Sequence, residues 1–470
     1  MRVRIVMPRK AMLAAVFGLL PIFLASKAFS HSSKVDYPST VRFADKALSF
    51  IVNSQVKKTV GIRQFKGEWQ SDMELDRDFI LLGKKGYKAK DSNLFTTGAI
   101  HNILAQIILL YPEYGYLRPV LIDAMDNLLR YKKPNADTYG FWQYLPKRPH
   151  ILSEDDKSLP LIRRSNNFFI KKKIVNYAEN VPDDADDTAM MLKAYKLHHK
   201  VTGHQVARVQ SISPIFDQYL DVKRKRMVNL YNIKGRGKHA TSAFLTWFAR
   251  ERRNFSTAVP KQDKVYLPLG VNDVDCVVNA NVLDTLTYYN ELEQSKGSKY
   301  ACQYLRDSIK KNRSKICGMY YPNWYNFPYS VGKAVESGVT CLDEQKGQMV
   351  SWLIGKQNSN GSWKSYKIKH KGREDIQSSA FALGSLLRLG DFQDPHTRKS
   401  IERGFSYLIS KAIEDSRGIH WPGGIFFSGG TIVRKTVIWR SDAYTTALVL
   451  EALVKYRRLL EMESAMELNL

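Results

Sequence analysis

One recurring pattern constrains this 470-residue chain more than any other. A small or polar residue precedes an alanine, and a leucine follows three residues after that alanine. Small residues let helices approach closely, and leucines at this spacing bury one stripe of a helix. Because such a helix cannot bury its apolar face alone, its repetition predicts helices stacked in series. Clear copies begin at Thr188-Ala189, Asn279-Ala280, Ser379-Ala380 and Thr446-Ala447, and looser copies span 97–104 and 242–247.

A second recurring unit is a turn of the form Gly-x-Trp. Glycine permits the backbone turn that ends a helix, and tryptophan covers the end of a helical hairpin with a large apolar area. A glutamine upstream of two copies can bond the peptide groups exposed at such a turn. We therefore interpret the unit as structural. The copies are Gly67–Trp69 after Gln55, Gly140–Trp142, Gly361–Trp363 after Gln357, and a stretched version at Gly418–Trp421.

The repeats predict an all-α fold. Apolar residues recur at three and four positions almost throughout, and strand alternation is scarce. Helical hairpins in series pack naturally as alternating inner and outer helices that close into a ring. We expect a single (α/α)6–7 toroid over residues 31–460. The stretch 143–180 is polar and irregular and predicts a long loop on one rim, and the tail 461–470 is predicted to be mobile.

The first thirty residues have a different pattern. A basic start precedes an uncharged apolar run of about 15 residues and the small-residue segment ASKAFS. This is the order of a secretory signal, and the run is shorter than the ~20 residues of a bilayer span. We expect residues 1–30 to be a signal peptide, cleaved near Ala28 to Ser30, and the protein to be periplasmic or secreted. The alternative is an uncleaved anchor in the inner membrane.

The net charge of +27 bears on partners. A basic surface attracts polyanions in general. Export argues against nucleic acid, which leaves an anionic membrane surface, an anionic glycan or a diphosphate group. A solvated basic surface without a specific partner is the plainer alternative. The basic clusters lie at Lys171–Lys173, Lys223–Arg226 and Arg250–Arg253.

Cysteine usage and common motifs exclude several classes of site. Cys276, Cys302, Cys317 and Cys341 permit two disulfides in any of three pairings. They show no CxxC or Cys/His spacing typical of zinc. The chain also has no phosphate loop, GxSxG elbow, HExxH motif or dinucleotide fingerprint. We therefore expect no bound cofactor from these classes.

The stretch VPDDADDTAM at 181–190 has three interpretations. Pro182 and Asp183 can begin a helix, with the other carboxylates complementing the helix dipole. Asp183, Asp184 and Asp187 can also be read as a magnesium site for a diphosphate, because carboxylate oxygens suit that ion. No second acidic motif supports this, so we predict no metal and keep magnesium as the alternative. In the third interpretation one carboxyl is a general acid, because clustered carboxylates cannot all ionise.

Two motifs carry a resemblance to a known family. QNSNGSW at 357–363 resembles the repeated glutamine-to-tryptophan motif of squalene and hopene cyclases, and DADDTAM at 184–190 resembles the class II cyclase acid motif. Together they resemble the terpene cyclase and prenyltransferase toroid superfamily. The resemblance implies that Asp186 is the general acid that protonates an alkene or epoxide, with Asp184 and Asp187 as its neighbours. The chain departs from the family in its single toroid and its export signal.

A second acidic stretch, VNDVDCVVNANVL, offers further candidates. Asp275 and Asn279 are four residues apart and share one helix face. Superposing the alanine-centred repeats places Asp184, Asp275 and Asp442 in one register. We expect Asp186, Asp275 and Asp442 to converge on one cavity mouth. The alternative for Asp275 and Asn279 is a capped helix with buried polar contacts.

A carbocation would also require aromatic faces. Phe244, Trp247, Trp439 and Tyr444 lie near the expected inner helices, although core packing is the more usual role for each of them. With Asn279 and Asp442 they are our candidates for substrate binding.

These observations lead to one preferred function and two alternatives. The preferred function is class II terpene cyclase-like isomerase or lyase chemistry on a hydrophobic, isoprenoid-like substrate, with Asp184, Asp186, Asp187 and Asp275 as catalytic candidates. The first alternative is a periplasmic glycan hydrolase or lyase that uses Asp186 and Asp275. The second is a non-catalytic basic toroid that binds an anionic lipid, a glycan or a protein.

Overall fold

The computed structural model describes residues 36–79, 83–146, 161–168, 179–207, 209–222, 240–249, 272–365, 373–429 and 436–467. The expected signal segment 1–30, most of the 143–180 insertion and all three basic clusters lie outside these residues. Among the described residues, no helix combines the length and the apolarity that crossing a membrane requires.

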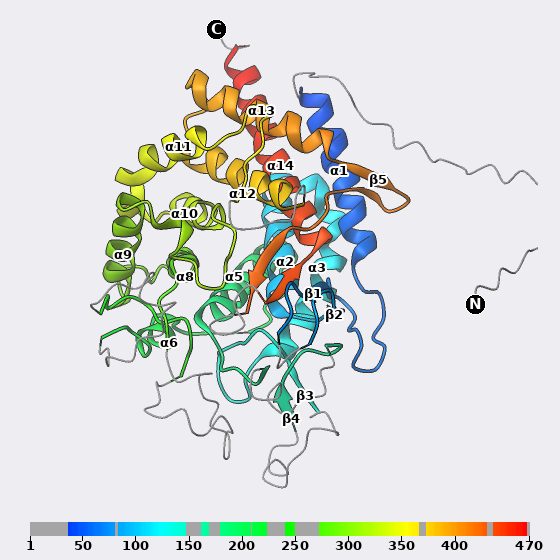
Figure 1. The fold of residues 1–470 in the computed structure, drawn as a ribbon, viewed down its shortest axis with the longest axis vertical. Helices are drawn as coiled ribbons and strands as arrows, with labels where there is room; N and C mark the ends of the chain where they lie inside the picture. The colour runs from blue at the N-terminus through cyan, green and yellow to red at the C-terminus, as the bar shows by residue number, and fades with distance from the viewer. Residues whose placement is uncertain are drawn as a thin grey trace, which may run out of the picture.

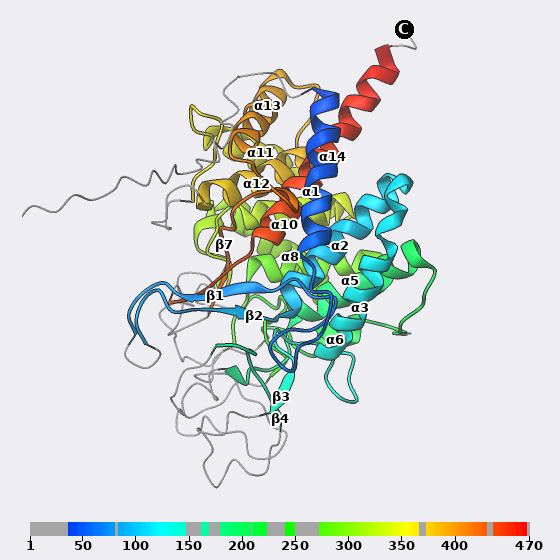
Figure 2. The same ribbon diagram turned by 90° about the vertical axis from the view of Figure 1, so that its right-hand side faces the viewer.

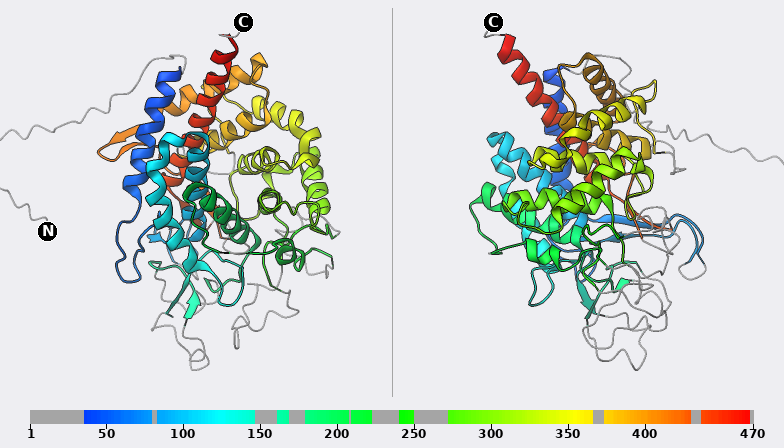
Figure 3. Two further views of the ribbon diagram at one scale, coloured as in Figure 1. Left: turned by 180° about the vertical axis from the view of Figure 1, so that it is seen from behind. Right: turned by 90° about the vertical axis from the view of Figure 1, so that its left-hand side faces the viewer.

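Six of the described helices form a closed inner ring. Each packs on the next in chain order, and the last packs on the first (Figure 1; Figure 3). The first of them, α2, buries residues on all its sides, as expected of a helix surrounded by others. The structure therefore confirms the predicted α/α toroid. The inner helices are α2 (Leu94–Leu110), α5 (Ala185–Thr202), α8 (Cys276–Tyr288), α10 (Asn326–Glu336), α12 (Arg373–Leu389) and α14 (Asp442–Glu467).

The remaining described helices lie outside this ring or in its connections. α1 packs along α14, α3 packs on α2 and α5, α9 packs on α8, and α13 packs on α12. Outer helices such as α9 bury one stripe only, which fits their position between core and solvent. They are α1 (Tyr37–Ser54), α3 (Arg118–Leu128), α6 (Ser213–Asp217), α9 (Ser298–Lys310), α11 (Lys346–Gly355) and α13 (Pro395–Ser410), with short 3₁₀ helices at Pro112–Leu117, Leu129–Tyr131, Arg313–Lys315 and Thr340–Gln345.

The Gly-x-Trp turns fasten consecutive hairpins together. The Gln357 amide donates to the carbonyl oxygens of Gly361 (3.0 Å) and Ser400 (2.8 Å). The Trp363 indole donates to the carbonyl of Leu353 at 2.7 Å. Equivalent indole bonds run from Trp69 to Ile51 and from Trp421 to Leu408. The structure confirms the structural interpretation for these three turns, whereas at Gly140–Trp142 the indole donates to the Asp91 carboxyl instead.

Glycine is required at these turns for a steric reason. Gly361 has φ +85°, and a Cβ there would lie 2.2 Å from the carbonyl oxygen of Arg403. Gly67 has φ +89°, and its Cβ would lie 1.8 Å from the carbonyl oxygen of Asp123. Both turns therefore combine a left-handed backbone with a close backbone approach.

Short strands, which the sequence does not predict, cover one rim of the ring. A four-stranded antiparallel sheet has the order β2-β1-β8-β7, and its strands β1 and β2 extend to one side of the helices in Figure 2. Two described stretches of the 143–180 insertion pair as β3 and β4. The strands are β1 (Ser71–Leu75), β2 (Lys88–Asp91), β3 (Tyr144–Pro146), β4 (Leu161–Arg163), β5 (Ile413–Asp415), β6 (Gly418–His420), β7 (Ile425–Ser428) and β8 (Val437–Arg440).

Two further features complete the fold. The cysteines pair as Cys276–Cys317 and Cys302–Cys341, one of the three pairings that the sequence allowed. The first bridge ties the start of α8 to the segment that leads to Tyr321. α14 continues to Glu467, so the predicted mobile tail 461–470 is helical as far as that residue.

Candidate functional site

A narrow cavity of about 50 Å³ lies among the inner helices. Its lining residues follow helical spacing on five of the six inner helices, so each of these five contributes one face. On α2 these are Phe95, Ala99, Asn102, Ile103 and Gln106; on α5, Met190 and Lys193; on α8, Val277, Asn281, Asp284 and Thr285. Tyr321 precedes α10, which adds Asn326, Tyr329, Ser330 and Lys333, and α14 adds Tyr444 and Glu451.

Asp186 lies in the first turn of α5 and is buried, with 5% of its surface exposed. Its Oδ1 accepts a hydrogen bond from the Asn281 amide at 2.7 Å, and its Oδ2 accepts one from the Tyr321 hydroxyl. Both partners line the cavity, so one layer of side chains separates the carboxyl from the cavity. Burial raises the pKa of Asp186, and its bonds to Tyr321 and Asn281 oppose that shift.

The other acids of the cluster have separate partners. Asp184, rather than the expected Asp183, is the N-cap of α5, and its carboxylate accepts from the Asp187 backbone N–H at 2.8 Å. Asp183 instead forms a buried ion pair with Arg163 and accepts from the Thr138 hydroxyl at 2.5 Å. Burial, with repulsion between neighbouring carboxylates, raises the pKa of both Asp184 and Asp187. Both carboxyls therefore release their protons less readily than a free aspartate does.

The magnesium interpretation required Asp183, Asp184 and Asp187 to face a common point. The structure directs Asp183 to Arg163 and Asp184 to the end of the helix. Within the part of the chain that the structure describes, no group of three or more metal-ligating side chains is arranged around one point.

Asp275 and Asn279 have structural partners. Asp275 caps α8: its Oδ1 accepts from the Val277 N–H at 2.7 Å, and its Oδ2 accepts from the N–H groups of Met319 and Tyr320. Asn279 is bonded to both the N–H and the carbonyl of Phe244. Asp275 is thus occupied by backbone donors and does not face Asp186 across the cavity. That geometry does not supply the pair of opposed carboxyls that glycan hydrolysis uses.

An aromatic layer lies beside Asp186 at the rim that carries the sheet. Ring centroids are 5.9 Å apart for Phe95 and Tyr321, 5.7 Å for Phe95 and Tyr444, and 5.9 Å for Tyr321 and Phe427. Tyr444 is the one predicted aromatic that lines the cavity. We use "aromatic layer" for Phe95, Phe141, Tyr320, Tyr321, Phe426, Phe427, Trp439 and Tyr444.

The remaining predicted residues lie around the cavity rather than on its wall. Trp439 is on β8, which leads into α14, and its indole donates to the buried carboxyl of Asp91 at 2.8 Å. Trp247 donates to the Tyr320 hydroxyl at 2.7 Å. Phe244 packs in the core against Phe216.

Asp442 does not converge with Asp186. It is exposed at the start of α14, where it accepts from the Gly423 N–H at 2.6 Å. The shared register of Asp184, Asp275 and Asp442 therefore marks the starts of inner helices.

Sequence reasoning missed several cavity residues: Asn281, Tyr321, Lys193, Asp284 and Lys333. A usable signal existed for Lys193, because it follows Asp186 by seven residues and shares its helix face. Asn281 and Asp284 share a face of α8 by the same rule. Tyr321 belongs to an irregular segment, and no periodicity could have placed it.

Comparisons with known proteins support the fold. No known family profile matches the sequence, and no curated protein matches it. Among solved structures, the type II terpene cyclase MstE from Scytonema is 13% identical, with a TM-score of 0.54 over 90% of this chain and 99% of that chain. A protein from Actinoplanes is 14% identical, with a TM-score of 0.50 over 89% and 99% of the two chains. MstE has also been solved with its substrate, geranylgeranyl dihydroxybenzoate. At this identity the likeness establishes a shared toroid fold.

Proposed function

We propose that this protein catalyses an acid-initiated, class II terpene cyclase-like reaction on an isoprenoid-like substrate, with Asp186 as the general acid. The observation that carries the proposal is the setting of Asp186. It is a buried carboxyl with a raised pKa, it is held by Asn281 and Tyr321, and it lies beside the aromatic layer. Protonation of a carbon–carbon double bond requires such a protonated and oriented acid.

The first step follows from these contacts. The π electrons of the alkene take the proton from Asp186, forming a C–H bond and a carbocation at the neighbouring carbon. The hydrogen bonds from Asn281 and Tyr321 stabilise the carboxylate that remains. Aromatic faces stabilise the cation, because ring quadrupoles attract positive charge. Loss of a proton from an adjacent carbon to solvent, and uptake of one from solvent by the Asp186 carboxylate, complete an isomerisation with no net consumption of protons.

The size of the cavity adds one requirement. At about 50 Å³ it has room for a few water molecules. Substrate entry therefore requires lining side chains to move, and Met190, Lys193 and Lys333 are among the long, flexible ones. Contact with the Asp186 carboxyl further requires Asn281 or Tyr321 to shift, because these side chains lie between it and the cavity.

We also propose an oxidising compartment, reached by export through the N-terminal segment. The two disulfides support this, because such bonds persist mainly outside the cytosol.

Turnover in deuterated water tests the proposed function. The full chain is incubated with geraniol, farnesol and geranylgeraniol and their monophosphates, and products are analysed by mass spectrometry. We expect a cyclised or isomerised product that carries deuterium from the acid. D186N removes the acid proton but keeps the side-chain shape, so the rate should fall roughly 100-fold or more.

The matched control is D343N, an exposed acid that pairs with Lys346, and it should leave the rate unchanged. Full activity in D186N, or a product without deuterium, would contradict the role of Asp186.

A further inference from the structure

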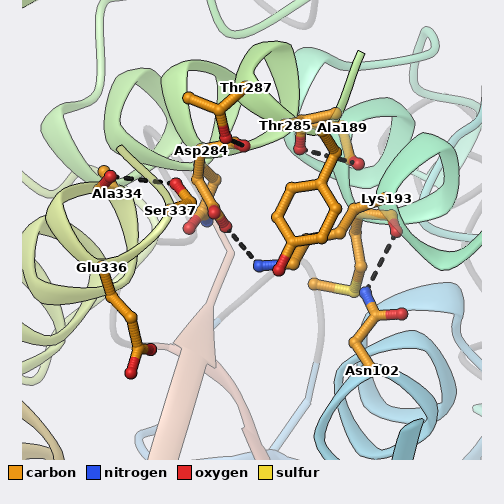
Figure 4. A network of polar contacts seen from close by, with 12 residues as sticks. Asn102, Ala189, Lys193, Asp284, Thr285, Thr287, Ala334, Glu336 and Ser337 are labelled. Atoms are coloured by element: carbon orange, nitrogen blue, oxygen red, sulfur yellow. Dashed lines mark hydrogen bonds and ion pairs between the residues drawn. The ribbon is translucent and has the colours of Figure 1, made fainter. Parts of the chain in front are cut away.

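Two lysines line the central cavity, and their surroundings differ. Lys193 on α5 pairs with Asp284 on α8 at 2.6 Å, as Figure 4 shows. Lys333 on α10 has no carboxylate within ion-pair distance among the described residues, and its Nζ lies 5.3 Å from the centre of the Tyr329 ring. The Lys333 nitrogen is therefore not held by a carboxylate, whereas the Lys193 nitrogen is.

The carboxylates that face Lys333 across the cavity already have partners. Glu451 on α14 pairs with Arg388 at 2.6 Å and accepts a hydrogen bond from the Tyr329 hydroxyl at 2.7 Å. Asp284 is the partner of Lys193. Lys333 therefore interacts with these carboxylates only at longer range.

The two lysines also differ in protonation. Burial alone would lower the pKa of Lys193, but the Asp284 carboxylate outweighs burial and raises it, so Lys193 stays charged. Loss of hydration lowers the pKa of Lys333 to about 8, because the distant carboxylates oppose it only in part. A lysine with this pKa is about one-tenth neutral at pH 7, roughly 300 times the neutral fraction of an ordinary lysine. Neutral lysines in such settings act as nucleophiles toward carbonyl carbons.

The cavity wall suits a small, uncharged molecule that both donates and accepts hydrogen bonds. Lys333 is partly exposed and lines the cavity, so a molecule inside can reach its nitrogen. On the same wall, the Asn326 Nδ2 is a buried donor without a partner, and the Asn281 Oδ1 and Asp284 Oδ1 are buried acceptors without one. An oxyanion could not donate to these acceptors, whereas a hydroxyl group can. The cavity of about 50 Å³ has the space of a few water molecules, which corresponds to a chain of about four carbons.

We propose that Lys333 captures a small aliphatic aldehyde as a Schiff base. The lone pair of the neutral Nζ attacks the carbonyl carbon and forms a C–N bond, while the π electrons of the carbonyl move to its oxygen, which gains one proton from the nitrogen. The carbinolamine that results carries a hydroxyl group, which matches the unpaired acceptors on the wall. This oxygen then leaves as water with the second proton of the nitrogen, and a C=N bond replaces the C–O bond. The amine and the aldehyde thus become an imine and water without an oxidant or a reductant. No step uses Asp186, so this covalent binding is separate from the proposed acid chemistry.

Reductive trapping with butanal tests the proposal. The full chain is incubated at pH 7 with butanal and cyanoborohydride, which reduces an imine to a stable amine, and peptide mass spectrometry gives the rate of modification at each lysine. We expect Lys333 to react at least tenfold faster than Lys193, which lines the same cavity, and than Lys310, which is exposed on α9. K333R keeps the positive charge but cannot form an imine, so the fast adduct should be absent from it.

Two controls connect the reactivity to the folded cavity. Wild-type protein unfolded in guanidinium chloride with its disulfides reduced should modify Lys333, Lys193 and Lys310 at similar rates. D284N removes the carboxylate that keeps Lys193 charged, so it should raise the rate at Lys193 and leave Lys333 reactive. Equal rates at the three lysines of the folded protein, a fast adduct that K333R retains, or an advantage of Lys333 that survives unfolding would overturn the inference.

Discussion

Asp91 provides a stability prediction whose sign changes with pH. Its buried carboxyl accepts hydrogen bonds from the Trp439 indole at 2.8 Å, the Trp142 indole at 3.0 Å and the Asn93 amide at 3.2 Å. Burial raises the pKa of Asp91 to about 7, and its hydrogen bonds counter this only in part. The folded protein therefore holds a proton on Asp91 between about pH 4 and 7, where the unfolded chain has released it.

The free energy of unfolding should respond accordingly. A carboxyl whose pKa is raised by folding stabilises the folded protein fully only below the pKa that it has in the unfolded chain. This stabilisation is lost as pH rises toward 7. This increase of about 3 in the pKa of Asp91 corresponds to ~4 kcal/mol in the free energy of unfolding. D91N cannot ionise, but its single acceptor oxygen leaves at least one donor unpaired, at a cost of about 1–2 kcal/mol. We expect D91N to be less stable than the wild type at pH 4 by that amount and more stable by ~2 kcal/mol at pH 8.

Urea unfolding at pH 4, 6 and 8 with the disulfides intact measures this difference. Asp187 and Asp275 titrate in both proteins, so their contributions cancel when the two are compared. Glu68 is coupled to Asp91, whose charge helps to raise its pKa, so D91N should lower the pKa of Glu68 slightly. The control D72N alters a partly exposed acid on the neighbouring strand, where the change should stay within about 0.5 kcal/mol at each pH. A difference between D91N and wild type that does not vary with pH would refute the reasoning.

Two further predictions concern the fold. Opening the Cys276–Cys317 bridge, whose cysteines are 41 residues apart, by C276S/C317S should lower the free energy of unfolding by about 4 kcal/mol, as denaturant titration can show; an unchanged midpoint would contradict this. G361A should destabilise by about 2–4 kcal/mol, because its Cβ meets the Arg403 carbonyl at a positive φ. G347A on α11 has open space around it and should be neutral or stabilising by up to ~1 kcal/mol in thermal unfolding; equal losses in the two variants would count against the steric argument.

The toroid was predictable because its signals are local and repeated. Each alanine-centred helix and each Gly-x-Trp turn marks one helical hairpin of the ring. The four-stranded sheet has no such signal: β1 and β8 come from opposite ends of the chain, and each is only four or five residues long. Strands this short leave no alternating pattern that stands out from the helical background.

The site was predictable only in part, for a geometric reason. Superposed repeats correctly placed Asp184 and Asp275 at equivalent helix starts, where both are caps. The superposition could not show that Asp186, two residues after Asp184, lies on the side of α5 that faces the cavity-lining Asn281 and Tyr321. Lys333 is separated from Asp186 by more than a hundred residues, and only closure of the ring brings α10 and α5 to one cavity.

The packing of α1 along α14 also bears on chain connectivity. These first and last described helices pack side by side, and the Tyr37 hydroxyl reaches Glu461 at 3.1 Å. Each inner helix packs on the two inner helices beside it. The chain can therefore begin at any hairpin without changing these contacts. A circular permutant that joins residue 467 to residue 36 by a linker, and opens the chain at the exposed turn of Gly338, should encode the same cavity. The order of the hairpins around the ring, more than the position of the ends, then defines this architecture.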